Sequence, residues 1–295
     1  MAERRVIYRQ RLLPILLVAP QLAITLVFFL WPAGQAIEQS FYLEDAFGLS
    51  REFVAGLNYE ALVGDTRYYR SFLTTLIFGL WVTALSIGIA LILALAANRV
   101  LAAALTYRSL LIWPYAVAPA ISGVLWFFLL NPTVGVFAEW LDLVGIDWNH
   151  YASGNQALAL VIAASVWKQI SYNFLFFLAG LQSIPKSLIE AAAIDKAGPW
   201  RRFWTITLPL LSPTTFFLLV VNIVYAFFDT FATIHATTSG GPADATTTLV
   251  YRVYNTGFIG QDYGSSAAQS VVLMALVIGM TAIQFRYVEK KVSYQ

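Results

Sequence analysis

The sequence contains no cysteine, and only 12% of its 295 residues are charged. The lack of cysteine excludes disulfide frameworks, thiolate zinc sites and cysteine nucleophiles. The scarcity of charge, with 59% hydrophobic residues and a mean hydropathy of +0.69, excludes a soluble protein of this length, because too much apolar surface would lie outside any single core. The chain therefore belongs in a membrane. A formal net charge of +2 is too small to indicate a nucleic-acid partner.

Sequence motifs for catalysis are also missing. No G-x-x-x-x-G-K-[ST] loop is present to hold the phosphates of ATP, and neither G-x-S-x-G nor H-E-x-x-H occurs. The two histidines, His150 and His235, are isolated and have no spacing typical of metal ligands. We expect no catalytic residues, no metal and no cofactor, so any ATP hydrolysis would be carried out by a separate subunit.

Long apolar segments dominate what is present. Crossing a bilayer takes roughly 20 apolar residues as a helix, and six segments of the sequence meet this requirement: 12–30, 72–97, 110–130, 157–178, 208–228 and 267–285. No internal repeat or soluble segment interrupts them. We therefore expect an all-α polytopic membrane protein with six transmembrane helices and one membrane domain over 1–295.

The positions of Lys and Arg predict the orientation. Thirteen of the 18 lie in four segments that six spans would place on one side of the membrane: Arg4, Arg5, Arg9, Arg11, Arg99, Arg108, Lys186, Lys196, Arg201, Arg202, Arg286, Lys290 and Lys291. The opposite loops, 31–71, 131–156 and 229–266, hold four others. Because cytoplasmic loops carry the excess of positive residues, both termini are predicted to be cytoplasmic.

A polar, helix-forming loop over 183–209 separates the fourth and fifth segments. Ser187 and Glu190 have the S-x-x-E spacing of a capping box, which predicts that a helix starts there. Gly198 and Pro199 are predicted to stop this helix and to permit another start. A short rigid helix outside the bilayer is typical of a docking element for a partner.

The same loop resembles the EAA loop of membrane subunits of bacterial ABC importers. The resemblance rests on Glu190-Ala191-Ala192 followed at the expected spacing by Ile206, Leu208 and Pro209. The family pattern has glycine where this chain has Lys196, and Gly198 is expected to take over the turn. The resemblance implies that the residues that couple the chain to its ATPase are Glu190, Ala191, Ala192, Asp195, Gly198, Ile206, Leu208 and Pro209.

Further motifs resemble the carbohydrate-uptake branch of this family: PYAV at 114–117, LQSIP at 181–185 and TSGGP at 238–242. VWKQISYNF at 166–174, DTF at 229–231 and SSAAQS at 265–270 are similar to the A-type permease subunit of sn-glycerol-3-phosphate importers. The segment at 53–59 only approximates the usual pattern.

The resemblance implies a type I ABC importer permease fold in the bacterial inner membrane. It also implies an assembly with a second, different permease subunit, two copies of an ATP-binding subunit and a periplasmic substrate-binding protein, surrounded by membrane lipids. The expected function is ATP-driven import of sn-glycerol-3-phosphate. The alternatives are an ABC importer of an uncharged sugar or polyol, and a proton-coupled secondary carrier.

Lys168 is the one charge deep within a predicted span. It lies about 11 residues, or roughly 16 Å, from either end, too far for its ammonium to reach water easily. A charge at that depth marks a transport path by default and would balance a phosphate. Pairing with Asp229 to lock two helices is an equally weighted alternative.

Other polar residues in the spans are predicted to turn inward, away from lipid. They complete a predicted substrate path made of Lys168, Gln169, Tyr172, Asn173, Asn222, Asp229, Thr230 and Gln269. Each of the uncharged members has the alternative role of a hydrogen bond between helices.

Overall fold

A computed structural model describes residues 12–44, 50–98 and 104–288. The predicted cytoplasmic N-terminus and tail lie outside the described residues, as does part of the first positive loop; the cations concerned are Arg4, Arg5, Arg9, Arg11, Arg99, Lys290 and Lys291. The chain forms two compact units, one of residues 1–64 and 255–272 and one of residues 65–254 and 273–295.

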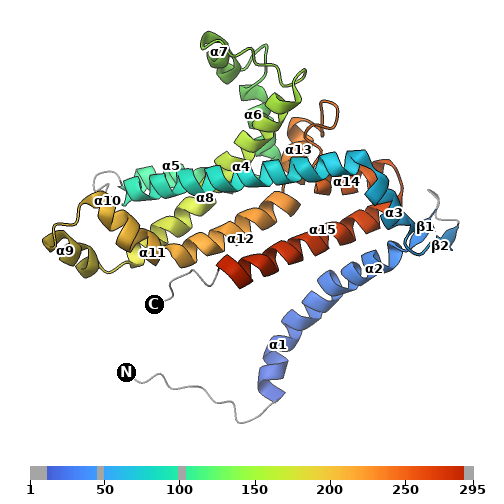
Figure 1. The fold of residues 1–295 in the computed structure, drawn as a ribbon, viewed down its shortest axis with the longest axis horizontal. Helices are drawn as coiled ribbons and strands as arrows, with labels where there is room; N and C mark the ends of the chain where they lie inside the picture. The colour runs from blue at the N-terminus through green and yellow to red at the C-terminus, as the bar shows by residue number, and fades with distance from the viewer. Residues whose placement is uncertain (1–11, 45–49, 99–103, 289–295) are drawn as a thin grey trace. The chain divides into compact units, whose positions relative to one another are not determined.

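The all-α fold class is confirmed, since helices account for nearly all of the regular structure that the described residues form. The exception within this part of the chain is a two-stranded antiparallel hairpin in the first unit, in which β1 (Tyr42–Glu44) pairs with β2 (Arg51–Phe53). The first unit otherwise consists of α1 (Leu12–Thr25), a π-helical turn (Leu26–Leu30), α2 (Trp31–Gln39), α3 (Leu57–Gly64), a second π-helical turn (Asn255–Ile259) and the first half of α15 (Tyr263–Ile283) (Figure 1).

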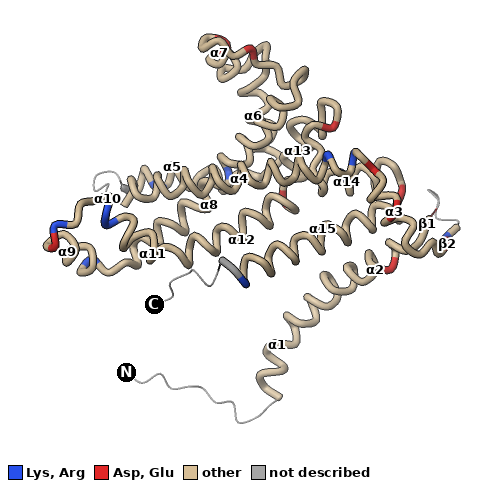
Figure 2. The backbone as a smooth tube through the Cα atoms, viewed as in Figure 1, with Lys and Arg blue, Asp and Glu red and all other residues tan. Residues whose placement is uncertain are grey.

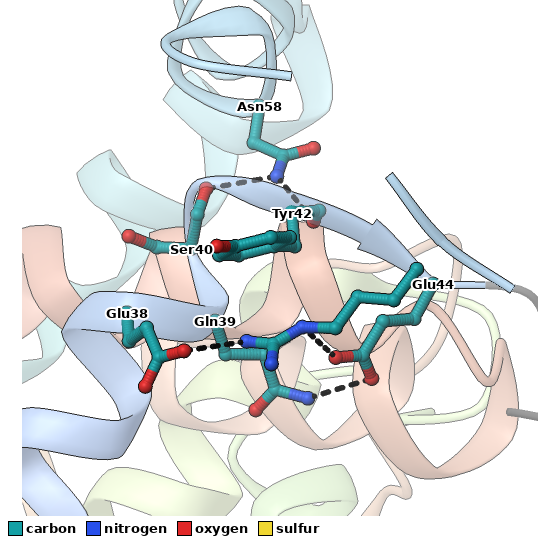
Figure 3. Close-up of polar contacts among 7 residues, drawn as sticks. Glu38, Gln39, Ser40, Tyr42, Glu44 and Asn58 are labelled. Carbon is teal, nitrogen blue, oxygen red and sulfur yellow. Dashed lines mark hydrogen bonds and ion pairs between the residues drawn. The ribbon is translucent and has the colours of Figure 1, made fainter. Parts of the chain in front are cut away.

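Arg51 fastens the hairpin to the end of α2. Figure 3 shows the labelled side chains of Glu38, Gln39 and Glu44 near one another at this junction. The Arg51 guanidinium contacts Glu38 at 3.2 Å and Glu44 at 3.1 Å, and it lies 3.9 Å from the centre of the Tyr42 ring. Gln39 donates a hydrogen bond of 3.1 Å to the same Glu44. Both acids of this cluster, Glu38 of α2 and Glu44 of the hairpin, are therefore paired with Arg51, which accounts for a cation on the side that is poor in them.

The second unit contains the remaining helices. They are α4 (Thr66–Ala97), α5 (Ala104–Ala116), α6 (Pro119–Leu129), α7 (Val136–Leu143), α8 (Gly154–Ser183), α9 (Lys186–Ile194), α10 (Pro199–Arg202), a π-helical turn (Phe203–Thr207), α11 (Leu208–Leu210), α12 (Ser212–Phe228), α13 (Phe231–Thr237), α14 (Leu249–Tyr254), the second half of α15 and a final π-helical turn (Gln284–Val288). The long helices α4, α8 and α12 pack side by side (Figure 1).

One end of this unit is closed by a cluster of small and branched apolar side chains. Ala94 and Ala97 at the end of α4 pack with Leu181 at the end of α8 and with Leu211, and Leu111 of α5 packs against them. The loops that follow α4 and α8 therefore lie at the same end. This agrees with the expectation that both belong to one side of the membrane.

At the opposite end, polar contacts join α4 to α14. Asp65 caps α4 by accepting a hydrogen bond of 2.8 Å from the backbone N–H of Arg67, and its other oxygen pairs with Arg252. The Thr75 hydroxyl accepts a hydrogen bond of 2.9 Å from the backbone N–H of Leu249. Two of the three loops predicted to face outward are thus tied together by the Asp65–Arg252 ion pair.

Two of the predicted spans are bent rather than straight. The segment predicted at 110–130 is the pair α5 and α6, which meet at 103° because Ala118 is extended before Pro119. The segment predicted at 208–228 bends by 64° at Leu211, where Pro213 has no N–H to continue the helix and the Ser212 hydroxyl donates to the Pro209 carbonyl instead, at 2.6 Å.

The number of spans follows from how these bends are counted. Four helices of the described chain are long and apolar enough to cross a membrane: Leu12–Gln39, Thr66–Ala97, Gly154–Ser183 and Tyr263–Arg286. The count reaches six when each bent pair is one span. A multi-pass protein is therefore supported, and the six-span domain over 1–295 stays a prediction.

Candidate substrate cavity and coupling loop

Lys168 lies at the middle of α8 and reaches the break between α5 and α6. Its ammonium donates hydrogen bonds to the carbonyl of Tyr115, at 3.2 Å, and to the carbonyl of Val117. Both carbonyls are left without helical partners because α5 ends there. The partial negative charge at a helix C-terminus favours a cation in this position, so the bend in the backbone creates the site that holds the lysine.

A cavity of about 640 Å³ opens beside this ammonium. Four of the predicted path residues line it together, namely Lys168, Gln169, Tyr172 and Asp229. The remaining walls are apolar apart from two further tyrosines, Tyr115 and Tyr225. The predicted alternative, an ion pair between Lys168 and Asp229, is wrong for this structure: among the described residues Lys168 is bound by backbone carbonyls and not by a carboxylate.

Asn173 and Asn222 have a different environment. Both are fully buried, and the Asn222 amide donates to the Asn173 oxygen at 2.8 Å and to the Leu218 carbonyl at 2.7 Å. The Asn222 oxygen accepts from the Ser86 hydroxyl at 3.0 Å and from the Gln169 and Asn173 amides at 3.3 Å each. This amide cluster of Ser86, Gln169, Asn173 and Asn222 joins α4, α8 and α12, so the alternative role of interhelical hydrogen bonding is what its geometry favours.

Thr230 and Gln269 are not brought to the cavity lining. Thr230 is fully buried, and its hydroxyl lies 3.4 Å from the Ala226 carbonyl one turn earlier. Gln269 belongs to the first unit, where it donates to the Thr256 hydroxyl at 3.0 Å. Their membership of the substrate path stays a prediction.

Tyr115 and Ser86 were missed by sequence reasoning. The Tyr115 ring lies 5.7 Å from the Lys168 ammonium and 5.6 Å from the Tyr172 ring. The signal for Tyr115 was available, because Pro114 and Pro119 enclose a segment where a helix must break. No comparable signal marked Ser86, since a lone serine in an apolar span is common and its partner is 136 residues away.

The loop helix α9 begins two residues earlier than the capping box predicts. Lys186 is its first residue and Pro185 precedes it, with no side-chain cap. Ser187 therefore lies inside the first turn and cannot accept the hydrogen bond of an N-cap, so the capping-box prediction is wrong. Pro185 itself accounts for the early start, since its fixed φ fits the entry to a helix.

The turn after α9 forms at Lys196 and not at Gly198. Lys196 has φ 57°, and its N–H bonds to the Ala193 carbonyl at 3.1 Å, while the Ala197 N–H bonds to the Ala192 carbonyl at 2.9 Å. This pair of bonds is a Schellman motif with Lys196 at its left-handed position. Gly198 is extended at φ −64° and precedes α10, which Pro199 opens as predicted. The expectation that Gly198 takes over the turn is wrong.

The predicted coupling residues span the whole loop. Glu190, Ala191 and Ala192 lie in α9, none of whose residues is buried, and Ile194 at its end is 82% exposed. Asp195 and Gly198 follow, and Ile206, Leu208 and Pro209 lie where the chain re-enters the bend before α12. Lys and Arg gather on α9 and α10 at this end (Figure 2). A projecting, uncovered helix is suited to binding another protein.

Comparison with known proteins agrees with this geometry. Residues 4–294 match the family of binding-protein-dependent transport system inner membrane components. The chain belongs to this family. It is a transport component rather than an enzyme, and it is a multi-pass protein of the inner membrane.

Several relatives of this transport component match over nearly the full length of both chains. The proteins named sn-glycerol-3-phosphate transport system permease protein UgpA are 59% identical in Rhizobium meliloti and 60% identical in Brucella abortus, each with 99% of both chains covered. The protein of that name in Yersinia enterocolitica is 60% identical with 96% of both chains covered. The resemblance inferred from the motifs is therefore confirmed.

Solved structures support the same fold. A chain of a bacterial ABC transporter that imports the acidic polysaccharide alginate superposes with a TM-score of 0.77, covering 94% of this transport component and 96% of that chain at 22% identity. A second alginate transporter structure, in complex with a periplasmic protein bound to an alginate pentasaccharide, gives 0.76. The ABC importer permease fold is thereby confirmed.

Proposed function

We propose that this chain is a permease subunit of an ATP-driven importer of sn-glycerol-3-phosphate across the bacterial inner membrane. The observation that carries the proposal is Lys168, an ammonium at the middle of α8 beside a cavity of about 640 Å³. The names of the relatives support the substrate. Membership of a binding-protein-dependent family removes the proton-coupled carrier from consideration.

The two carbonyls on Lys168 are weaker partners than a phosphate. Carbonyls present partial charges, whereas a phosphate monoester carries up to two full negative charges and forms shorter, stronger hydrogen bonds with an ammonium. A substrate that enters the cavity would replace the carbonyls of Tyr115 and Val117 as the hydrogen-bond partner of Lys168. Binding would then release the end of α5, which gives the substrate a direct means of acting on the α5–α6 bend.

The other side chains of the cavity suit the glycerol part of the molecule. Gln169 and Tyr172 offer donors and acceptors for hydroxyl groups, and Asp229 accepts hydrogen bonds while repelling a phosphate from its side of the cavity. The lining therefore contains one cation and one anion. It favours a substrate with its phosphate at Lys168 and its hydroxyls toward Asp229.

The energy for transport would enter through α9. In the proposed assembly two different permease subunits form the pore, two copies of an ATPase bind their loops, and a periplasmic protein delivers substrate. Glu190 would contact a basic residue of the ATPase. Glu190→Lys is expected to leave the complex in the membrane but to abolish ATP-driven uptake, and normal uptake by this variant would contradict the coupling role.

This coupling role requires α9 to be cytoplasmic, with both termini on the same side. A cysteine at Ser187 tests the orientation, since the natural chain has no cysteine. A membrane-impermeant maleimide should label Ser187→Cys in inverted vesicles only. Labelling from outside intact spheroplasts would overturn the proposed topology.

An importer of an uncharged sugar or polyol is the second candidate, and one observation favours it. Lys168 already has two hydrogen-bond partners, so it needs no anion to be stable. Proteoliposomes containing the assembled importer and its binding protein separate the two candidates. We expect ATP-dependent uptake of labelled sn-glycerol-3-phosphate that a large excess of glycerol does not inhibit; uptake of an uncharged sugar or polyol in its place would favour the second candidate.

A further inference from the structure

The largest cavity beside the coupling loop is distinct from the one at Lys168. Its volume is about 1,270 Å³, and it lies where the ends of α4 and α8 meet α9 and α10. Figure 1 shows these four elements converging at the α9 end of the second unit. Glu190, the proposed ATPase contact, also lines this cavity, but neither transport of glycerol phosphate nor docking of an ATPase accounts for the aliphatic part of its lining.

Two chemically different walls line this cavity. One wall is aliphatic and is provided by the last turns of two long helices, through Leu91, Leu95 and Leu181. The other carries the cations Lys186 and Arg202, next to the aromatic rings of Trp200 and Phe203. A hydrocarbon wall joined to a cationic rim matches the two parts of an anionic phospholipid.

Both cations of the lining are available to an anion. Among the described residues, neither Arg202 nor Lys186 forms an ion pair. A phosphodiester oxygen placed between them would form charge-assisted hydrogen bonds, which are stronger than bonds to neutral acceptors.

The surroundings place the cavity at the depth of lipid headgroups. Trp200 is 74% exposed and Trp204 is 51% exposed, and tryptophans with this exposure are typical of the membrane–water interface. In the proposed orientation this end faces the cytoplasmic leaflet, whose anionic lipids attract basic pockets between transmembrane helices. One acid, Glu190, also lines the cavity, so the two cations leave its lining net positive.

From this combination we infer that the cavity binds one anionic phospholipid of the cytoplasmic leaflet. Its phosphate contacts Arg202 and Lys186, and an acyl chain covers Leu91 and Leu95. Because Glu190 shares the lining, the lipid sits against the same helix that docks the ATPase. The inference rests on the proposed orientation of α9, but not on the identity of the transported substrate.

Native mass spectrometry of the assembled importer tests this inference. The complex is released from nanodiscs that contain phosphatidylcholine with phosphatidylglycerol, in the absence of glycerol phosphate and nucleotide, and the retained phosphatidylglycerol is counted. The test variants are Lys186→Gln and Arg202→Gln. The matched controls are Lys196→Gln and Arg201→Gln, which remove the same charges from exposed positions outside the cavity lining.

Wild type should retain one phosphatidylglycerol in preference to phosphatidylcholine. Each test variant should weaken that retention roughly fivefold and both together about 25-fold, as expected for cations near anionic lipid, while the controls stay at the wild-type level. Inorganic phosphate at millimolar concentration should not displace the lipid, because it lacks the acyl chain. Equal loss in tests and controls, retention by the double variant, displacement by phosphate, or no lipid on wild type would each overturn the inference. Glycerol-phosphate uptake, measured separately, can fail or succeed without changing this result.

Discussion

Two polar regions occupy neighbouring turns of α8 and α12, and their hydrogen bonding differs. In the amide cluster, Asn173 and Asn222 satisfy each other and are closed to solvent. In the cavity, Lys168 is held by backbone carbonyls at a helix break, and it lines an open space together with Asp229. The comparison shows that polarity inside a span does not identify a transport path. What distinguishes the path is a polar group whose partners can be replaced.

Removing the charge at Lys168 should have the largest effect on transport. Lys168→Met is expected to raise the apparent KM for sn-glycerol-3-phosphate by roughly 10- to 100-fold, since it removes a charge-assisted hydrogen bond. Uptake kinetics in proteoliposomes measure this. The KM of Lys168→Arg, which keeps the charge, should lie between those of the wild type and Lys168→Met. Normal uptake with unchanged KM in the methionine variant would mean that the cavity does not bind the phosphate.

Changing the amide cluster should affect stability instead. Asn222→Leu is expected to lower the free energy of unfolding by about 1–3 kcal/mol, because it leaves Asn173 and Ser86 buried without their partner. Thermal unfolding of the assembled importer should detect this loss. The KM of the surviving protein should change far less than in Lys168→Met, since Gln169 is the one cluster member that also lines the cavity. The double change Asn173→Leu with Asn222→Leu should recover part of the stability. A large rise in KM for the single variant would erase the distinction between the two regions.

The left-handed backbone at Lys196, outside both polar regions, predicts a smaller effect, which is stabilising. Lys196→Gly should stabilise the end of α9 by about 1 kcal/mol, because glycine adopts the left-handed conformation without the clash of a Cβ. Slower hydrogen exchange at the backbone amides of positions 196 and 197 would report this stabilisation. Ala197→Gly is a control that should not slow exchange. Faster exchange in Lys196→Gly would contradict the assigned turn.

The smallest effect should come from His150, a buried polar group in the loop between α7 and α8, outside the predicted spans. Burial lowers the pKa of His150 below its usual 6.5. The unfolded chain then takes up the proton more readily than the folded chain. The contribution of His150 to the free energy of unfolding is therefore fully present above about pH 6.5 and is lost as the pH drops through the folded-state pKa. Unfolding temperatures between pH 7.5 and 5 should show this decline.

His150→Phe should flatten this dependence, because the ring contact with Tyr151 remains while the proton site is removed. His235 is exposed, so His235→Gln should leave the decline as in wild type. Uptake KM should be the same for both variants at pH 7.5. If the unfolding temperature of His150→Phe still declines at low pH, other groups cause the decline.

Apolar length, charge asymmetry and the EAA pattern predict the fold class, the family and the helical coupling loop from sequence. The break at 117–118 and the bend at Leu211 were not predicted, although Pro119 and Pro213 cause them. Hydropathy reports the apolar length of a segment but not whether its helix is straight or bent. The carbonyl partners of Lys168 could not be predicted, since backbone carbonyls at residues 115 and 117 become acceptors only once the helix breaks. The same holds for Lys196, whose left-handed turn overrides the propensity that favoured Gly198.

The decisive experiment on substrate binding at Lys168 is a structure of the assembled importer trapped with sn-glycerol-3-phosphate in the closed pore. We predict a phosphate oxygen at about 2.7–2.9 Å from the Lys168 ammonium, with the carbonyls of Tyr115 and Val117 released from it. A phosphate bound elsewhere in the pore, with Lys168 still on both carbonyls, would show that Lys168 does not bind the substrate.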